Sequence, residues 1–312
     1  MDFHPSVLVK EVIECLRPRP GGVYLDATCG AAGHSLALLQ AGRGARVVGI
    51  ERDPSLVERA RLRVRNERIP PEQFVLVPGA YIHLRTILTE LAIDRVDGCL
   101  FDLGACAFHF AESGRGFSFR AAEEPLDMRY DPGQGPTAAD LLARLSPSEL
   151  ERLFREAGGE RWARRIARRI AEQRATSPIR TAGQLASLVE QAIPRKAWPP
   201  DIHPATRVFM SLRARVNEEF EQIARGIPEA IDVLRPGGRI AVISFHSGED
   251  GLVKRIFREA AGLGPGHPVT GQRPKARLKI LTRKPITASP EEIARNPGAR
   301  SAKLRAAEKL GD

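Results

Sequence analysis

Short apolar runs rich in β-branched residues alternate with helical patterns near the amino terminus. Helices are expected from about His34, and from the capping pair Asp53-Pro54 to about Glu67, because proline is favoured in a first helical turn. Four runs predict strands, at 23–27, 45–51, 74–78 and 96–102. Strands and helices that alternate in this way predict a parallel, doubly wound α/β sheet.

The alternation stops after residue 111 and resumes after residue 211. Turn-rich stretches and arginine-rich helical patterns fill the interval. Beyond it we expect a helix near 216–234, a turn, a strand at 239–244, a helix from about Glu249 and a last strand at 277–282. The pattern predicts one α/β domain, residues 1–111 and 212–312, interrupted by a mostly helical insert at 112–211. The tail from Arg283, punctuated by prolines, is expected to be at best partly ordered.

Composition narrows the class of protein. Hydrophobic residues make up 42% of the 312 residues, enough for a sizeable core, which argues against a disordered chain. No apolar run approaches the roughly 18 residues that cross a membrane, and the first ten residues lack the pattern of a signal peptide. We therefore expect a cytoplasmic protein. The four cysteines and seven histidines are scattered, so neither a disulfide framework nor a metal site is expected.

A glycine loop follows the first predicted strand. The sequence there is Asp26-Ala-Thr-Cys-Gly30-Ala-Ala-Gly33-His34, and the second strand ends in Glu51. This layout is typical of adenosine binding, in which an acid accepts hydrogen bonds from the ribose. The spacing does not match the G-x-G-x-x-G of nicotinamide enzymes, and an acid four residues before Gly30 suits a cationic cofactor. The alternative is a structural glycine turn in a flavodoxin-like domain.

Several further blocks occur in a fixed order along nearly the whole chain. They are His4-Pro-Ser-Val-Leu, Asp26-Ala-Thr-x-Gly-x-x-Gly-His-Ser35, Glu51-Arg-Asp-Pro54, Asp102-Leu-Gly104, Arg115-Gly-Phe-Ser-Phe119, Pro125-Leu-Asp-Met-Arg129, Gly159-Glu-Arg161, His203-Pro-Ala-Thr-Arg207, Ser244-Phe-His-Ser247 and Asn296-Pro-Gly-Ala-Arg-Ser-Ala-Lys-Leu-Arg305. Together they resemble the MraW-type (RsmH) methyltransferases of small-subunit ribosomal RNA.

The resemblance implies a class I S-adenosylmethionine-dependent methyltransferase, a Rossmann-like doubly wound sheet with a helical substrate-recognition insert after strand four. It implies methyl transfer from S-adenosyl-L-methionine to the exocyclic N4 of a cytidine in the decoding region of 16S rRNA. The expected partners are 16S rRNA and the small ribosomal subunit, with monomer and homodimer both open. Two alternatives remain: a methyltransferase acting on another nucleic-acid or small-molecule amine, and a ribosome-binding assembly factor with reduced catalysis.

The resemblance also assigns site residues. Asp102 and His246 are the expected catalytic residues, with Asp102 accepting an amine hydrogen. The expected cofactor-binding residues are Ala32, Gly33, His34, Glu51, Tyr81, Asp102 and His109. For Asp102 the alternative is a strand-end carboxylate that only holds its loop. Cys106 offers a rival mechanism, covalent attack on cytosine C6, but it lacks the Pro-Cys or Thr-Cys pair of enzymes that methylate C5.

The chain departs from the family pattern close to these residues. Gly30-Ala-Ala-Gly33 replaces a loop richer in glycine, and Glu51 stands where aspartate is usual. Ala105-Cys106-Ala107 and His109 replace Val-Ser-Ser and Gln, and Gly248 and Gly251 replace Leu and Arg.

The positive charge, +10 overall with a pI near 9.9, is concentrated in two segments. Residues 151–180 hold nine Arg against four Glu, and residues 273–309 hold eleven Lys or Arg against three Glu. Helical spacing places Arg161, Arg165 and Arg168 in one stripe. We expect these three and Arg207 to bind RNA phosphates. The alternatives are a solvated helix of a heat-adapted protein and, for Arg161, a brace for the insert.

Overall fold

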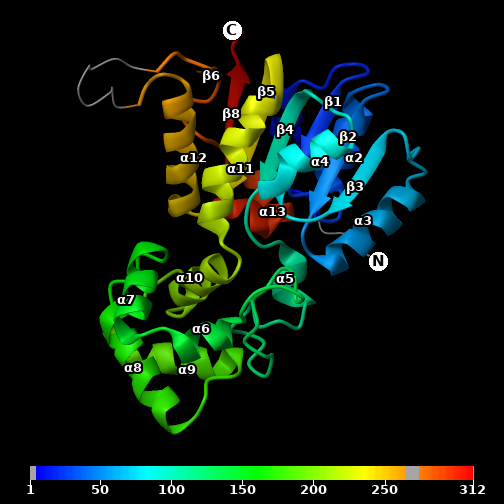
Figure 1. The fold of residues 1–312 in the computed structure, drawn as a ribbon. Helices are drawn as coiled ribbons and strands as arrows, with labels where there is room; N and C mark the ends of the chain where they lie inside the picture. Colours follow the sequence, from blue (N-terminus) through cyan, green and yellow to red (C-terminus); the bar gives the residue numbers. More distant parts are fainter. Residues whose placement is uncertain (1–4, 265–273, 312) are drawn as a thin grey trace. The chain divides into compact units, whose positions relative to one another are not determined.

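The computed structural model describes residues 5–264 and 274–311 (Figure 1). His4 of the first sequence block and Arg273 of the basic tail lie outside these residues. The chain divides into two units, Met1–Gly104 with Phe220–Asp312, and Ala105–Glu219. The boundaries expected at 111/112 and 211/212 therefore fall inside the second unit. The observed boundaries instead lie next to the end of the strand Val96–Asp102 and the start of the helix Glu219–Val233.

The first unit is built around an eight-stranded sheet. Its strand order is β3-β2-β1-β4-β5-β8-β6, and β7 pairs with β8 outside this path. β1 to β5 are parallel to one another, whereas β8 is antiparallel to β5, β6 and β7. The strands are β1 Val23–Asp26, β2 Arg46–Glu51, β3 Phe74–Pro78, β4 Val96–Asp102, β5 Leu234–Ser244, β6 Leu278–Ile280, β7 Ile286–Thr287 and β8 Lys303–Lys309.

The carboxyl-terminal part of the chain differs from the prediction in two ways. The sheet is mixed rather than wholly parallel, because β8 inserts between β5 and β6. The tail beyond Arg283 is ordered: it supplies β7, helix α13 (Pro290–Arg295) and β8. Leu304 and Ala306 of β8 are completely buried. The long pairing of β8 with β5, from Arg239↔Glu308 to Ser244↔Lys303, holds this basic segment in the core.

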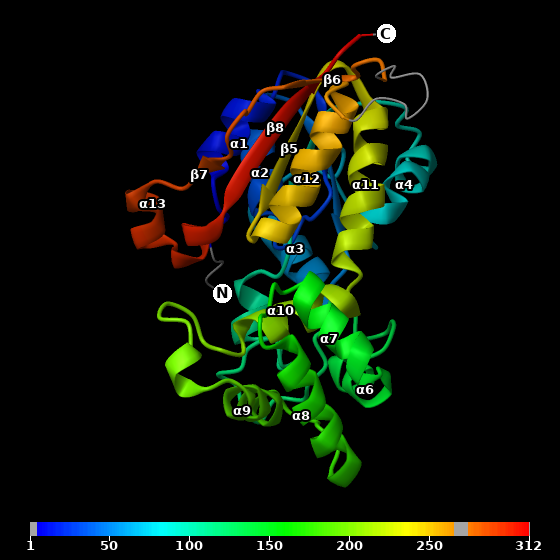
Figure 2. The ribbon, with the colours of Figure 1, turned by 90° about the vertical axis from the view of Figure 1, so that its left-hand side faces the viewer.

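Helices cover both faces of the sheet, as the alternating pattern predicts. Apolar side chains of α4, α11 and α12 form one cluster with the strands, and side chains of α1, α2 and α3 form another. Figure 2 shows α11 and α12 side by side. These helices are α1 Val9–Leu16, α2 Gly33–Ala41, α3 Pro54–Asn66, α4 Leu84–Glu90, α11 Glu219–Val233 and α12 Ser247–Ala260.

The second unit is helical and has its own apolar core. Phe154, Ile166, Leu185 and Leu212 are completely buried there. Its helices are α5 Ala107–Ala111, α6 Ala138–Arg144, α7 Pro147–Glu156, α8 Ala163–Thr176, α9 Ala182–Ala192 and α10 Thr206–Val216. The predicted helical insert after the fourth strand is thus confirmed as a fold feature. Among the described residues of both units, none of the helices combines the length and apolar character of a membrane span.

Candidate functional site

Three carboxylates lie at the carboxyl ends of adjacent parallel strands. Asp26 ends β1, Glu51 ends β2 and Asp102 ends β4, and β1 is hydrogen-bonded to both other strands. Ligands of open α/β sheets bind at this edge, outside the strand ends. The fold therefore brings together residues that are far apart in the sequence, as predicted from the strand pattern.

The glycine loop connects β1 to α2 at the same edge. Gly30 has φ +53°, and a methyl group added there would meet open space. Ala32 caps α2 with φ +63°, a left-handed conformation that glycine adopts more easily. Its methyl group is completely buried in the core of the first unit. The loop thus keeps its shape despite the alanines, because apolar burial compensates for backbone strain.

Glu51 joins the glycine loop to the end of β2. Its Oε2 accepts a hydrogen bond from Gly30 N at 2.7 Å, and its Oε1 accepts one from Asp53 N at 2.7 Å. Burial raises the pKa of this carboxyl to about 7, against the opposing effect of these two hydrogen bonds. The backbone N–H of Arg52 also donates to this carboxylate. Because a carboxylate has about four acceptor sites, it retains the capacity for one further donor.

Asp26 and His34 are buried beside the partly exposed Asp102, and the three form one set of ionisable groups. Asp26 accepts a hydrogen bond from Ser35 Oγ at 2.7 Å. Burial raises the pKa of Asp26, while the nearby His34 opposes the rise. His34 Nε2 lies 3.5 Å from Asp102 Oδ2, longer than a normal hydrogen bond. Burial opposes the charged form of His34, but the carboxylates of Asp102 and Asp26 outweigh it and raise its pKa.

This set is incompletely paired. Among the described residues, both ring nitrogens of His34 and the Oδ1 atom of Asp102 are buried without a hydrogen-bond partner. A buried polar atom without a partner costs free energy, and each such atom in a native protein needs an explanation. A polar ligand at the strand ends would supply the missing partners.

Thr28 is a site residue that the sequence analysis missed. Its Oγ1 accepts a hydrogen bond from Asp102 N at 2.6 Å. The contact ties the glycine loop to the end of β4 and so helps to fix the position of Asp102. The signal in the sequence was the threonine of the Asp26-Ala-Thr block, but its partner depends on the order of the strands.

Tyr81 begins the short 3-10 helix Tyr81–His83 after β3. Its ring packs edge-on against Phe101 of β4, with 5.2 Å between ring centres. A methyl group added to Gly226 of α11 would collide with the ring. Tyr81 is therefore held by packing, and its role beside an adenine stays a prediction.

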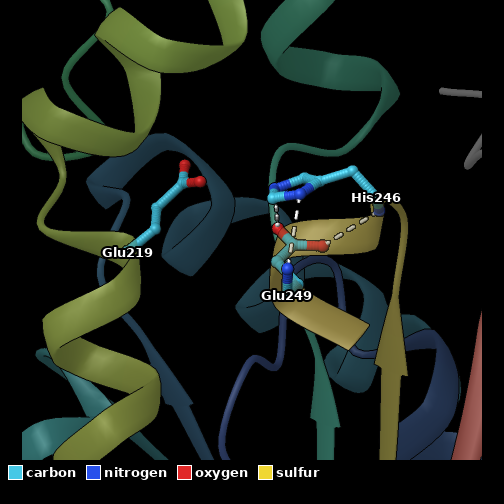
Figure 3. Close-up of side chains that lie close together, drawn as sticks. All are labelled: Glu219, His246 and Glu249. Atoms are coloured by element: carbon cyan, nitrogen blue, oxygen red, sulfur yellow. Dashed lines mark hydrogen bonds and ion pairs between the residues drawn. The ribbon is translucent and has the colours of Figure 1, made fainter. Parts of the chain in front are cut away.

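His246 caps α12 and pairs with a carboxylate of the same helix (Figure 3). Its Nδ1 faces Glu249 N at 3.4 Å and its Nε2 lies 3.0 Å from Glu249 Oε1. Glu249 is almost completely buried and also accepts a hydrogen bond from Phe245 N at 2.8 Å. Both ring nitrogens of His246 thus have local partners. The structure supplies a reason for its position that does not involve a substrate, and its catalytic role stays a prediction.

His109 lies in the second unit. Its buried ring packs against Phe117 and Tyr130. Its Nδ1 accepts a hydrogen bond from Cys106 N at 3.0 Å and lies 3.3 Å from Cys106 Sγ. Cys106 and His109 together cap α5. The two departures from the family pattern are therefore one structural unit, a Cys-x-x-His cap. The expected cofactor contact of His109 stays a prediction.

The predicted RNA-binding arginines also lie in the second unit. Arg161, Arg165 and Arg168 are exposed, but α8 begins at Ala163, so Arg161 lies in the turn before it and the expected helical stripe holds only for Arg165 and Arg168. Arg168 Nε is 2.9 Å from Glu172 Oε1. Arg207 Nη1 lies 4.0 Å from Oε2 of the buried Glu160. In the Gly159-Glu-Arg161 block it is therefore the glutamate, rather than Arg161, that is buried and paired.

Comparisons with known proteins agree on one family. The model of the MraW methylase family matches residues 1–310. The ribosomal RNA small subunit methyltransferase H of Trichlorobacter lovleyi is 49% identical, over 99% of this chain and 98% of its own. The proteins of the same name from Syntrophotalea carbinolica and Geobacter sulfurreducens are 47% and 46% identical, each over 98% of this chain and 98% and 99% of their own.

Proposed function

Because the chain belongs to the MraW methylase family, we propose that it transfers a methyl group from S-adenosylmethionine to the exocyclic N4 of a cytidine in the decoding region of 16S rRNA. The observation that carries this proposal is the incompletely paired set of His34 and Asp102 at the strand ends. Relatives that share 46% to 49% of their residues with this chain over nearly their full length are named for small-subunit rRNA. A protein with this substrate works in the cytoplasm.

The residues at the sheet edge fit S-adenosylmethionine. Glu51 has the capacity to accept from a ribose hydroxyl, and the open space at Gly30 lets a ligand approach the backbone. Asp26 and Asp102 supply negative charge for a ligand that carries a sulfonium and an amine. Ala32, Gly33 and His34 open α2, where backbone N–H groups point outward and favour a carboxylate. The bound cofactor supplies an electrophilic methyl group.

Asp102 lies at the end of β4 and has an unused acceptor atom, so it can hold the amine of the substrate. The N4 lone pair of cytosine is delocalised into the ring, so this amine is a poor nucleophile. Transfer requires it to be held at near-attack distance, with its hydrogens accepted by fixed groups. Asp102 Oδ1 is an acceptor of this kind, and the hydrogen bond from Asp102 N to Thr28 Oγ1 holds the backbone that carries it.

The exposed arginines of the second unit suit an RNA substrate. Guanidinium groups bind phosphates without reading sequence, so they contribute affinity and a dependence on salt. A base paired or stacked in RNA does not reach a recessed methyl group. The proposed reaction therefore requires the target cytidine to be splayed out.

The proposal is tested by methyl transfer from labelled S-adenosylmethionine to naked 16S rRNA and to assembled 30S subunits, followed by digestion to nucleosides and mass spectrometry. Label in N4-methylcytidine that disappears in Asp102→Ala supports the proposal. Label in another nucleoside or in a small amine indicates a different acceptor. Binding to subunits without any transfer indicates an assembly factor.

A further inference from the structure

A helix near the carboxyl terminus, α13, contacts the amino-terminal segment 5–8 beside the glycine loop, within the first unit. Glu292 Oε1 accepts a hydrogen bond from Leu8 N at 2.6 Å, and Asn296 Nδ2 donates one to Pro5 O at 2.9 Å. Glu292 belongs to α13, and Asn296 is the residue that caps its carboxyl end. The segment 5–8 is thus fastened at both of its ends by one short carboxyl-terminal helix.

The other side of this segment packs on the glycine loop. A methyl group added at Gly33 would collide with Ser6 Oγ and lie 3.3 Å from Ser6 Cβ. Leu8 and Ala32 are completely buried and belong to the same apolar cluster, which also contains Ala299. The segment 5–8 therefore lies between the start of α2 and the region around α13.

The conformation of Leu8 indicates that the fastening is needed. Its φ is +52°, a left-handed value that a residue with a branched side chain adopts only where its surroundings hold it. Burial of the side chain holds it here, together with two backbone hydrogen bonds: its N–H donates to Glu292, and its carbonyl accepts from Val12 N at 2.9 Å. Loss of the Glu292 acceptor removes the one of these contacts that comes from α13.

We propose that Glu292 and Asn296 are positioning residues for the cofactor loop, which they act on by fastening segment 5–8 against Gly33. The inference rests on the proposed function, since the ligand of the loop is taken to be S-adenosylmethionine. It assigns the carboxyl-terminal α13 an effect on cofactor affinity, although none of its residues is buried. The loop residues, the fastened segment and α13 all belong to one unit.

Two readouts test the inference, and the first needs no cofactor. Hydrogen exchange of the Leu8 amide reports on the fastening in the free protein. Binding of S-adenosylhomocysteine, followed by calorimetry, reports on the loop. We expect Glu292→Ala and Asn296→Ala each to accelerate exchange at Leu8 and to weaken binding by about tenfold, with the melting temperature nearly unchanged because α13 lies at the surface.

Two further variants show whether Glu292 acts through its hydrogen bond or through its negative charge. Glu292→Gln keeps an oxygen that accepts from Leu8 N but removes the negative charge, which is one of several that raise the pKa of His34. If fastening is the cause, this variant binds like the wild type. Glu291→Ala is the matched control, because Glu291 is a carboxylate in the same helical turn and is exposed. It should leave both readouts unchanged.

Several results would overturn the inference. Unchanged binding in Glu292→Ala and Asn296→Ala would do so, as would an equal loss in Glu291→Ala, or a loss of affinity that only follows a fall in melting temperature. A wild-type protein that does not bind S-adenosylhomocysteine contradicts the proposed function itself. Normal wild-type binding that Glu292→Ala leaves intact contradicts only the positioning role.

Discussion

The strand-end site of the first unit and the arginine surface of α8 carry charge in opposite ways. At the strand ends, Asp26 and His34 are buried, and Asp26 accepts a direct hydrogen bond from Ser35 Oγ at 2.7 Å. On α8, Arg165 and Arg168 are exposed, with partners such as Glu172 that are themselves exposed. The first region has polar atoms that lack partners, whereas the second has charges that water can solvate.

This difference decides what each region reveals about its ligand. A buried polar group without a partner is costly, so it points to a particular small ligand and a particular place. An exposed arginine costs little by itself, so it indicates only the sign of the partner's charge. A single substitution at the strand ends should therefore cause a large loss of activity or cofactor affinity. A substitution on α8 should cause a small loss of RNA affinity that depends on the salt concentration.

The largest effect is expected for Asp102→Ala. Loss of an acceptor aimed at the reacting amine should lower the rate of methyl transfer on the order of a hundredfold or more. A thermal melt should show that the variant remains folded. A folded variant that keeps more than about a tenth of the wild-type rate would contradict the role of Asp102 as acceptor.

A smaller effect, on RNA binding, is expected when Arg161, Arg165 and Arg168 are together replaced by Gln. If each contacts a phosphate, the slope of log affinity against log salt should fall by about 2 to 3 units, at roughly 0.7 to 0.9 per contact. The matched control replaces the exposed Arg61, Arg65 and Arg68 of the first unit, with the same change in charge.

An unchanged slope in a stable triple variant would remove α8 and the turn before it from the RNA surface. The basic tail would then be the main candidate. A lowered melting temperature with or without RNA would instead indicate that the arginines brace the unit.

Glu51→Gln should weaken the binding of S-adenosylhomocysteine about tenfold at pH 8. Both oxygens of Glu51 accept backbone hydrogen bonds, so the amide nitrogen of Gln must face an N–H group.

The pKa of about 7 for Glu51 also predicts that cofactor affinity depends on pH. Ionised Glu51 is the better acceptor for ribose hydroxyls, so wild-type affinity should rise from pH 6 to pH 8. Calorimetry at both pH values should show this rise, and Glu51→Gln should abolish it. A wild-type affinity that does not change with pH would contradict the role of Glu51.

The smallest effect is expected for Cys106→Ser. Serine is a good N-cap residue and its hydroxyl can occupy the position of Sγ beside His109, so the rate should stay within about twofold. Methyl transfer measured with the same rRNA substrate tests this. A dead enzyme with normal cofactor binding, or a covalent protein–RNA adduct in the wild type, would support attack by the thiol.

The strand-end site was predictable because it depends on local pattern and one topological rule. The apolar run Val96–Asp102 marks a whole strand, and its last residue is the acid. Once the strands are parallel, their carboxyl ends share an edge, which brings Asp102 near Glu51 and the glycine loop. The alanine at 32 was recognised as a departure, but its left-handed conformation was not predictable from the sequence.

Features that depend on pairing between distant segments were not predictable. The strand Lys303–Lys309 contains Lys, Ala and Glu, which favour helices, and it forms a strand because β5 and β6 pair with it. The capping pair of His246 with Glu249 and the hydrogen bond between Leu8 and Glu292 likewise depend on side-chain geometry. For the arginines, exposure and the sign of the charge were predictable from the sequence, and the fold adds no specific partner for RNA.

The central claim is that the strand ends bind the cofactor and the arginines bind RNA. It is tested most directly by measuring two affinities on the same two variants. The variants are Glu51→Gln and the triple Arg161, Arg165 and Arg168 replacement; the ligands are S-adenosylhomocysteine, followed by calorimetry, and 16S rRNA over a range of salt. The account predicts that Glu51→Gln weakens cofactor binding and leaves the RNA salt slope unchanged, whereas the arginine triple does the reverse. A triple variant that remains folded and loses cofactor and RNA binding to the same extent would contradict it.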